Sequence, residues 1–344
     1  MLPRRTEDGR VQNEIVTPVN DAGCIIVPSG DQKDIWKRVL SIDSAGKVVI
    51  SDNDADYMTD EVRMQRLGWK WIYGYGIMEG FSTRLKELGH KADYTDSKTL
   101  ELLDRAVARW VTALKANGID LSNCYEPIHD EPNSKILDDF IAIARVLRRH
   151  GLKVAVDLAT WCSLDDARRL APVVDMWEPW EPRITTRDTA AEELAIYKAS
   201  GKPIRPYLCS ISGNTAPYLD YHRFRGIRAF LLGADGFCTW AANSWRGNDY
   251  RGSENVLDGK KAGTPGAFYV HHGDFGPVAT MRLEAFREGI EDLYWLSRAA
   301  SSESATKFRS KKYLNELLDR KDARAVRSWR NALLRALAAV QSMP

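Results

Sequence analysis

Short apolar runs alternate with segments of helical periodicity over most of the chain. The apolar runs predict eight strands, at residues 24–28, 47–51, 71–75, 123–129, 153–158, 173–177, 204–209 and 236–241. Between several of these runs, apolar residues recur at helical spacing, at residues 99–116, 136–150, 165–170 and 189–199. Strands that alternate with helices form parallel sheets, so the pattern predicts an α/β chain with a TIM-type (β/α)8 barrel, irregular at its N-terminal strands.

Helical periodicity returns after the last predicted strand, at residues 281–300, 312–318 and 323–340. A segment rich in glycine and polar residues, 243–276, precedes these helices and is too long for an ordinary connection, which predicts a functional or mobile loop. The expected organisation is therefore a barrel over residues 1–300 that carries this loop, followed by C-terminal helices over residues 301–344 that pack on the barrel.

The composition favours a packed enzyme-like domain and excludes several other classes. The 344 residues include 49 Lys and Arg against 47 Asp and Glu, and a net charge of +2 argues against a nucleic-acid partner. No apolar stretch approaches the length of a membrane span. The N-terminus lacks the apolar core of a signal peptide, so a cytoplasmic location is expected for the sequence as written, and a secreted or periplasmic one if the N-terminus has been trimmed. The oligomeric state is not predicted.

Cysteine and aromatic residues indicate which kinds of site the chain can carry. The five cysteines lie far apart and include no C-x-x-C pair, so we expect free buried thiols and neither a disulfide framework nor a zinc site. We expect no metal and no organic cofactor. The 11 Trp and 13 Tyr residues are numerous enough to provide both core packing and platforms on which the C–H face of a sugar stacks.

One segment joins a predicted strand to adjacent carboxylates. Cys124-Tyr-Glu-Pro-Ile-His-Asp-Glu-Pro132 ends its apolar run at Asp130 and Glu131, and active sites of such barrels form at the carboxyl ends of the strands. Pro132 favours an extended conformation of Glu131, which would let both side chains reach the barrel mouth. The alternative is that the pair only caps the following helix.

Adjacent carboxylates suit one particular kind of glycoside hydrolysis. Most glycosidases use two carboxyl groups from separate strands. Where the substrate carries a 2-acetamido group, its own carbonyl oxygen can attack the anomeric carbon. One carboxylate then polarises the amide N–H and the other protonates the leaving oxygen. Two neighbouring like charges also favour a proton on one of them, as a general acid requires.

Three motifs together resemble the "domain of unknown function 4091" proteins, which are related to glycoside hydrolase family 123. They are His129-Asp-Glu-Pro132, Gly236-Phe-Cys-Thr-Trp-Ala-Ala-Asn-Ser-Trp245 and Arg282-Leu-Glu-Ala-Phe-Arg-Glu-Gly-Ile-Glu-Asp-Leu-Tyr-Trp-Leu296. The resemblance implies substrate-assisted, retaining hydrolysis of β-linked N-acetylhexosaminides, with N-acetylgalactosamine favoured, in an oligosaccharide or glycoconjugate.

The resemblance also implies roles for individual residues. Asp130 would orient the acetamido group and Glu131 would be the acid/base, while Trp240, Asn243 and Trp245 would line the sugar pocket. The charged helix of the third motif is expected to be a buried brace. Family members carry a β-sandwich before the barrel, and the residues before position 71 are too few for it, so this module is expected to be absent or trimmed.

Further candidates for substrate contact lie at or near the ends of the predicted strands: His129, Asp157, Trp161, Trp177, Glu178 and Tyr207. Among them, Trp161 and Trp177 are candidate stacking platforms together with Trp240, and core packing is the alternative for each. Two other functions stay open. One is a glycosidase of a non-acetamido sugar that pairs Asp130 and Glu131 with Asp157 or Glu178. The other is a non-catalytic carbohydrate-binding barrel.

Overall fold

The computed structural model describes residues 4–5, 11–12, 31–57, 72–73, 77–208, 217–239, 270–273, 276–279, 281–299 and 302–341. The chain divides into two compact units. The central unit is Val16–Ile204, and the terminal unit combines Met1–Ile15 with Arg205–Pro344. Among the described residues, no helix combines the length and the apolar character that a membrane crossing requires.

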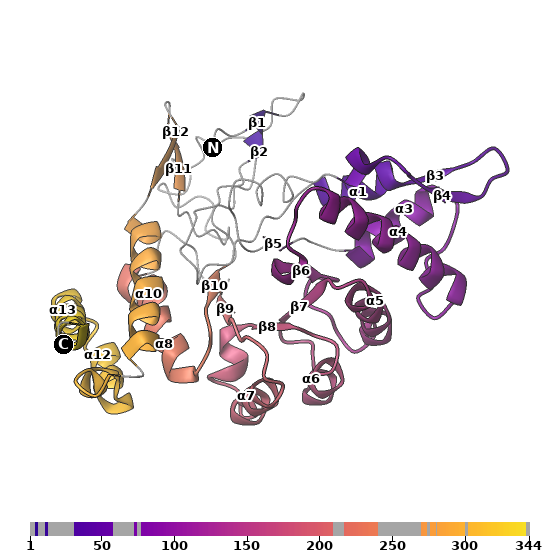
Figure 1. The fold of residues 1–344 in the computed structure, drawn as a ribbon. Coiled ribbons are helices and arrows are strands. Elements are labelled where there is room, and N and C mark those ends of the chain that lie inside the picture. Colours follow the sequence, from indigo (N-terminus) through magenta and orange to yellow (C-terminus); the bar gives the residue numbers. More distant parts are fainter. Residues whose placement is uncertain are drawn as a thin grey trace, which may run out of the picture. The chain divides into compact units, whose positions relative to one another are not determined.

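A parallel sheet of four strands organises the central unit (Figure 1). Its strands are β5 (Ile72–Tyr73), β6 (Cys124–Pro127), β7 (Lys153–Leu158) and β8 (Met176–Pro179), and they lie side by side in the order of the chain. Because every crossover moves on by one strand in the same direction, right-handed connections place all the intervening helices on one face of the sheet. The carboxyl ends of the strands therefore share one edge, which is where such sheets carry their sites.

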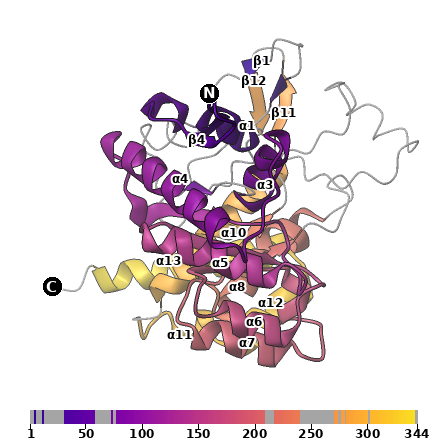
Figure 2. The same cartoon turned by 90° about the vertical axis from the view of Figure 1, so that its right-hand side faces the viewer.

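Of the helices that alternate with the strands of this sheet, two begin at side-chain caps. The alternating helices are α4 (Ser97–Ala116), α5 (Leu137–Arg149), α6 (Leu164–Leu170) and α7 (Ala190–Ala199). The side chain of Asp96 caps the first turn of α4, and Ser163 and Asp166 form a capping box at the start of α6. Figure 2 shows α6 and α7 lying beside each other. Short 3-10 turns, η2 (Leu121–Asn123) and η3 (Glu181–Ile184), precede β6 and follow β8.

The beginning of the central unit differs from the sequence-based expectation. It comprises α1 (Asp31–Val39), β3 (Leu40–Ile42), β4 (Val48–Ile50), η1 (Asp54–Tyr57) and α3 (Ile77–Glu87). Residues 47–51 were predicted to be a barrel strand, but β4 pairs antiparallel with β3 in a local hairpin. The Asp43 carboxylate accepts the backbone N–H groups of Ala45 and Lys47 and so fixes this turn. The strand predicted at residues 24–28 lies outside the described residues.

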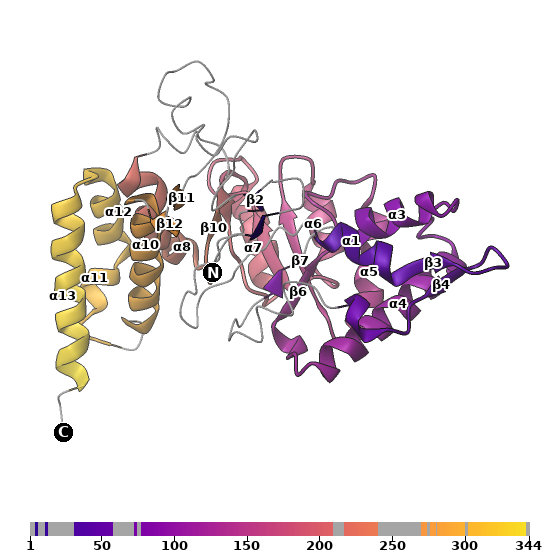
Figure 3. The same cartoon turned by 90° about the horizontal axis from the view of Figure 1, so that it is seen from above.

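The terminal unit is mostly helical. It contains η4 (Tyr218–Arg223), α8 (Phe224–Leu232), α10 (Met281–Arg298), α11 (Thr306–Arg309), α12 (Lys311–Arg320) and α13 (Ala323–Gln341). Its core joins these helices through buried apolar side chains that include Phe224, Leu296, Leu314 and Trp329. Figure 3 shows α13 running beside α10 and α12.

Three pairs of short strands complete the terminal unit. They are β1 (Arg4–Arg5) with β2 (Val11–Gln12), β9 (Tyr207–Leu208) with β10 (Cys238–Thr239), and β11 (Val270–Gly273) with β12 (Gly276–Ala279). β9 and β10 are parallel, and both lie within predicted strands. The segment predicted to be an irregular loop, 243–276, ends in the antiparallel hairpin of β11 and β12, while its residues 243–269 lie outside the described part.

Two glycines allow α8 and α10 to approach each other closely. A Cβ atom built on Gly226 would lie 1.8 Å from the carbonyl oxygen of Gly289. A Cβ atom on Gly289 would lie 2.6 Å from the carbonyl oxygen of Arg223. The two helices therefore pack backbone against backbone, and only glycine fits at the point of contact. This explains in physical terms why a glycine stands inside the charged stretch of α10.

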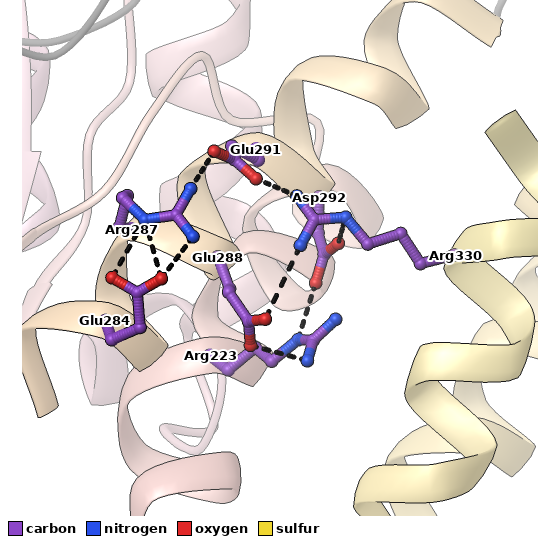
Figure 4. Close-up of polar contacts among 7 residues, drawn as sticks. All are labelled: Arg223, Glu284, Arg287, Glu288, Glu291, Asp292 and Arg330. Atoms are coloured by element: carbon purple, nitrogen blue, oxygen red, sulfur yellow. Dashed lines mark hydrogen bonds and ion pairs between the residues drawn. The ribbon is translucent and has the colours of Figure 1, made fainter. Parts of the chain in front are cut away.

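The charged residues of α10 form a network with α13 and with the end of η4 (Figure 4): Arg223, Glu284, Arg287, Glu288, Glu291, Asp292 and Arg330. Asp292 is fully buried, and its carboxylate lies 2.9 Å from Arg223 Nε and 3.3 Å from Arg330 Nε. Burial raises the pKa of Asp292 to about 6 against the opposing effect of both arginines, so the group is charged at neutral pH. The expected brace is thus buried at Asp292 and Arg223, whereas Glu284 and Arg287 are exposed, and its described partners are helices of the terminal unit.

Candidate active site

The carboxyl ends of β6, β7 and β8 bring four acidic residues to one edge of the central sheet. Asp130 and Glu131 follow β6, Asp157 lies near the end of β7, and Glu178 lies on β8. Asp157 and Glu178 are paired in the ladder, so their side chains leave the sheet on the same face. Both are buried, with 9% and 2% of their surface exposed, whereas Asp130 is exposed. This edge of the sheet therefore carries two buried acids, Asp157 and Glu178, and one exposed acid, Asp130.

Glu131 has an unusual backbone conformation. Its φ is +48°, in the left-handed region. For a residue with a side chain this conformation costs about 1–3 kcal/mol, and the following Pro132 also disfavours helical geometry. The prediction of an extended Glu131 is therefore wrong. The Glu131 N–H donates a hydrogen bond to Asp157 Oδ1 at 3.2 Å, and this contact from the neighbouring strand supports the strained turn.

Two acidic side chains of this cluster contact each other. Asp157 is hydrogen-bonded through its side chain to the side chain of Asp130. Two carboxyl groups can form such a bond only when one of them carries a proton. Burial raises the pKa of Asp157 well above its ordinary value, and the hydrogen bond and charge of Asp130 and the charge of Glu178 add to this shift. Asp157 therefore favours its protonated form and can donate a hydrogen bond to the Asp130 side chain.

Trp161 borders the candidate site on the loop between β7 and α6. Its Nε1–H donates a hydrogen bond to Glu131 Oε2 at 3.1 Å. Its side chain is nevertheless 63% exposed, which is unusual for a tryptophan. The indole thus holds the Glu131 carboxylate at its polar edge and leaves ring surface open to a ligand.

A buried ion pair supports the loop that carries Trp161. Arg183 and Glu193 are each 1% exposed, and Arg183 Nε donates to Glu193 Oε1 at 2.6 Å. The remaining guanidinium nitrogens donate to the carbonyl oxygens of Ala159 and Cys162, at the two ends of the loop. Sequence reasoning missed this role, because nothing local distinguishes Arg183 from the many surface arginines of the chain.

His129 links the candidate pair to α3. Its Nδ1 lies 2.6 Å from the carbonyl oxygen of Asp130, so this nitrogen carries the proton, since a carbonyl can only accept. Its Nε2 lies 3.7 Å from Glu79 Oε1. The Met78 N–H at the start of α3 donates to the carbonyl oxygen of Ile128. These contacts place Glu79, which sequence reasoning did not single out, next to the candidate site.

Trp177 is not part of this arrangement. It is fully buried, its Nε1–H donates to Ser200 Oγ at 2.9 Å, and its ring packs on Tyr197 with centroids 4.5 Å apart. Neighbouring residues of a strand face opposite sides, so Trp177 points to the helical layer when Glu178 points away from it. The prediction of a sugar platform at Trp177 is wrong.

The remaining sequence-based candidates are placed as follows. Tyr207 is buried on β9 and belongs to the terminal unit. Trp240, Asn243 and Trp245 lie outside the described residues. The helix-cap alternative for Asp130 and Glu131 does not hold, because α5 begins after Ile136 without any side-chain cap.

In the part of the chain that the structure describes, no group of three or more His, Cys, Asp or Glu side chains is arranged to hold a metal ion. Cys124, Cys162 and Cys238 are free and buried, as predicted for them.

Several solved structures resemble the chain at low similarity. The endo-beta-1,4-mannanase from Thermotoga petrophila is 13% identical with a TM-score of 0.43, and the match covers 69% of this chain and 60% of the mannanase. XacCel5A is 11% identical with a TM-score of 0.43, over 76% of this chain and 90% of that one. The D-allulose 3-epimerase from Methylomonas sp. is 9% identical with a TM-score of 0.32, over 72% and 93% of the two chains.

Sequence comparison is more specific than these structural likenesses. No curated protein matches the chain significantly. The family described as glycoside hydrolase 123, catalytic domain, matches residues 66–298, which is more than half of the chain and includes the Asp130–Glu131 pair. The chain therefore belongs to the glycoside hydrolase 123 catalytic domain family.

Proposed function

We propose that this chain hydrolyses β-linked 2-acetamido glycosides, with N-acetylgalactosamine as the favoured sugar and with retention of configuration. The observation that carries the proposal is the arrangement of Asp130 and Glu131. The two are adjacent in sequence, follow the carboxyl end of β6, and are held by Asp157 on one side and Trp161 on the other. Family membership supports glycoside hydrolysis, and the pairing of neighbouring acids supports the substrate-assisted route.

The proposed reaction uses Glu131 as acid and then as base. The acetamido carbonyl oxygen of the substrate forms a bond to the anomeric carbon while the glycosidic C–O bond breaks. Glu131 gives its proton to the leaving oxygen, and Asp130 accepts a hydrogen bond from the amide N–H and stabilises the oxazolinium cation. Glu131 then takes a proton from the water that opens this intermediate, which returns the acid to its starting state.

The position of Asp157 argues against a second mode of hydrolysis. A glycosidase of a non-acetamido sugar needs an ionised carboxylate as nucleophile or base. Burial and its acidic neighbours favour the neutral form of Asp157, so it is poorly suited to that role.

The closed eight-stranded barrel stays a prediction. Its support is the four-stranded parallel sheet of the central unit and the parallel pair β9 and β10 of the terminal unit.

A panel of aryl glycosides tests the proposal. We expect hydrolysis of 4-nitrophenyl 2-acetamido-2-deoxy-β-D-galactopyranoside and no comparable hydrolysis of the corresponding β-D-galactopyranoside. A thiazoline analogue of N-acetylgalactosamine, which mimics the cyclic intermediate, should inhibit competitively. Equal turnover of the two glycosides would support a non-acetamido glycosidase, and binding of oligosaccharides without turnover would support a carbohydrate-binding protein.

Substitution of Trp161 separates its two proposed contributions. Trp161→Phe removes the hydrogen bond to Glu131 and keeps a ring, so we expect kcat to fall by up to about tenfold with little change in KM, since a partly exposed hydrogen bond is worth about 1.5 kcal/mol or less. Trp161→Ala also removes the ring and should raise KM. Steady-state kinetics on the acetamido substrate measures both effects.

The control for the Trp161 variants is Tyr313→Ala, which truncates another partly exposed aromatic side chain, on α12. It should leave kcat and KM unchanged. If both Trp161 variants behave like this control, Trp161 is a surface residue without a role in the reaction.

A further inference from the structure

We propose that Asp157 is a positioning residue that holds both members of the candidate pair at once, donating a hydrogen bond to the Asp130 carboxylate and accepting one from the Glu131 N–H. This inference rests on the function proposed above. In this inference Asp157 supports the pair and does not contact the sugar. Sequence reasoning had considered Asp157 a sugar contact or the second acid of a non-acetamido glycosidase.

The contact to Glu131 supports a backbone conformation that the local sequence disfavours. Glu131 is left-handed at φ +48° and precedes Pro132. Local preferences would return it to an extended conformation. The Asp157 acceptor, 3.2 Å from the Glu131 nitrogen, is a backbone contact that opposes this return. Without it, the Glu131 carboxylate would leave its position beside Trp161.

The contact to Asp130 places the two acidic side chains against each other. Asp157 is buried, so desolvation penalises a negative charge on it and favours its protonated form. Asp130, from the end of β6, and Glu178, from β8, act in the same direction, whereas the contact to Glu131 is made by its backbone N–H. The Asp130 side chain is thereby held where it can accept a hydrogen bond from a substrate N–H.

Asparagine and alanine at position 157 make a matched pair of tests. The amide of Asp157→Asn can donate to Asp130 and accept from the Glu131 N–H, so both hydrogen bonds survive and neither titrates. We expect this variant to keep kcat within about threefold of wild type at neutral pH. Asp157→Ala loses both hydrogen bonds, and we expect kcat to fall at least about 100-fold while KM changes little, because the sugar contacts remain.

The pH profile distinguishes positioning from a merely structural role. In wild type, loss of the Asp157 proton as pH rises breaks its hydrogen bond to Asp130 and should lower kcat. The carboxamide of Asp157→Asn cannot lose a proton in this range. Its kcat should therefore decline at higher pH than that of wild type. Asp319→Asn, an exposed substitution on α12, should leave the profile of wild type unchanged.

Two measurements decide the inference without any substrate. Hydrogen–deuterium exchange of the segment around Glu131 should be at least about tenfold faster in Asp157→Ala than in wild type, and unchanged in Asp157→Asn.

The second measurement is the dependence of folding stability on pH. The unfolded chain releases the Asp157 proton from about its ordinary pKa of 3.8 upward, whereas the folded protein retains it. Folding stability contributed by this group is therefore lost as pH rises, and the advantage of Asp157→Asn over wild type should grow with pH.

The outcomes separate this inference from the proposed function. If wild type hydrolyses no 2-acetamido glycoside, the proposed function fails, and exchange and stability still decide the positioning role. If wild type is active but Asp157→Ala matches it in kcat and in exchange, the positioning role is overturned and the proposed function stands. Slow hydrogen–deuterium exchange around Glu131 in Asp157→Asn, together with a decline of its kcat at higher pH than in wild type, supports the inference.

Discussion

Replacement of Glu131 with glutamine is expected to lower the kcat of glycoside hydrolysis by about 10²–10⁴-fold, the contribution of a positioned general acid. The amide keeps the size of the side chain and can still interact with Trp161, but it has no proton of suitable acidity to give to the leaving oxygen. The loss should be largest for alkyl glycosides and smaller for nitrophenyl glycosides, whose leaving groups need little protonation. Comparing kcat for both substrate types in wild type and Glu131→Gln measures this.

Glu101→Gln is the matched control for this variant. Glu101 lies exposed on α4, so its substitution should leave kcat unchanged for both substrate types. An activity of Glu131→Gln equal to that of the control on alkyl glycosides would remove Glu131 from the mechanism. Addition of azide or formate is a second check, since a small anion that restores turnover of nitrophenyl substrates indicates an otherwise intact site.

Gly226→Ala is expected to produce the largest loss of stability among single-atom changes in the terminal unit. The added methyl group would lie 1.8 Å from the carbonyl oxygen of Gly289, so α8 and α10 would have to separate. Backbone atoms cannot rotate away as side-chain ends can, and we expect the free energy of unfolding to fall by about 3 kcal/mol or more. Equilibrium unfolding in urea, followed by circular dichroism, measures this loss.

Two further variants test this result, one at the same contact and one as an exposed control. Gly289→Ala meets the carbonyl oxygen of Arg223 at 2.6 Å and should also destabilise the protein, from the opposite helix. Ser297→Ala, on an exposed position of α10, should stay within about 0.5 kcal/mol of wild type. If Gly226→Ala is as stable as Ser297→Ala, the close approach of α8 and α10 is not a feature of the folded protein.

Where structure depends on neighbours in sequence, the chain predicts it closely. The predicted helix at residues 99–116 corresponds to α4 (Ser97–Ala116), and that at 189–199 to α7 (Ala190–Ala199). The predicted strand at 153–158 coincides with β7. Helical periodicity, caps and continuous apolar runs are local properties, so they can be recognised without knowing what the element packs against.

Where the role of an element depends on which strand it pairs with, sequence reasoning fails. β4 has the apolar run of a barrel strand, but its hydrogen-bonding partner is β3. On β8, Trp177 and Glu178 are adjacent, and only the pairing with β7 decides that the aromatic residue joins the helical layer. A shift of one residue would exchange their faces, because side chains alternate along a strand.

The sequence by itself determined the order of strands and helices from β6 to α7, and it placed Asp130 and Glu131 after β6. Only the tertiary structure decided how that pair is held. Pro132 alone would make Glu131 extended, but the Asp157 carboxyl, brought alongside by the pairing of β6 and β7, supports a left-handed turn. Local preferences amount to a few kcal/mol at most, so one well-placed contact from the next strand is enough to overcome them.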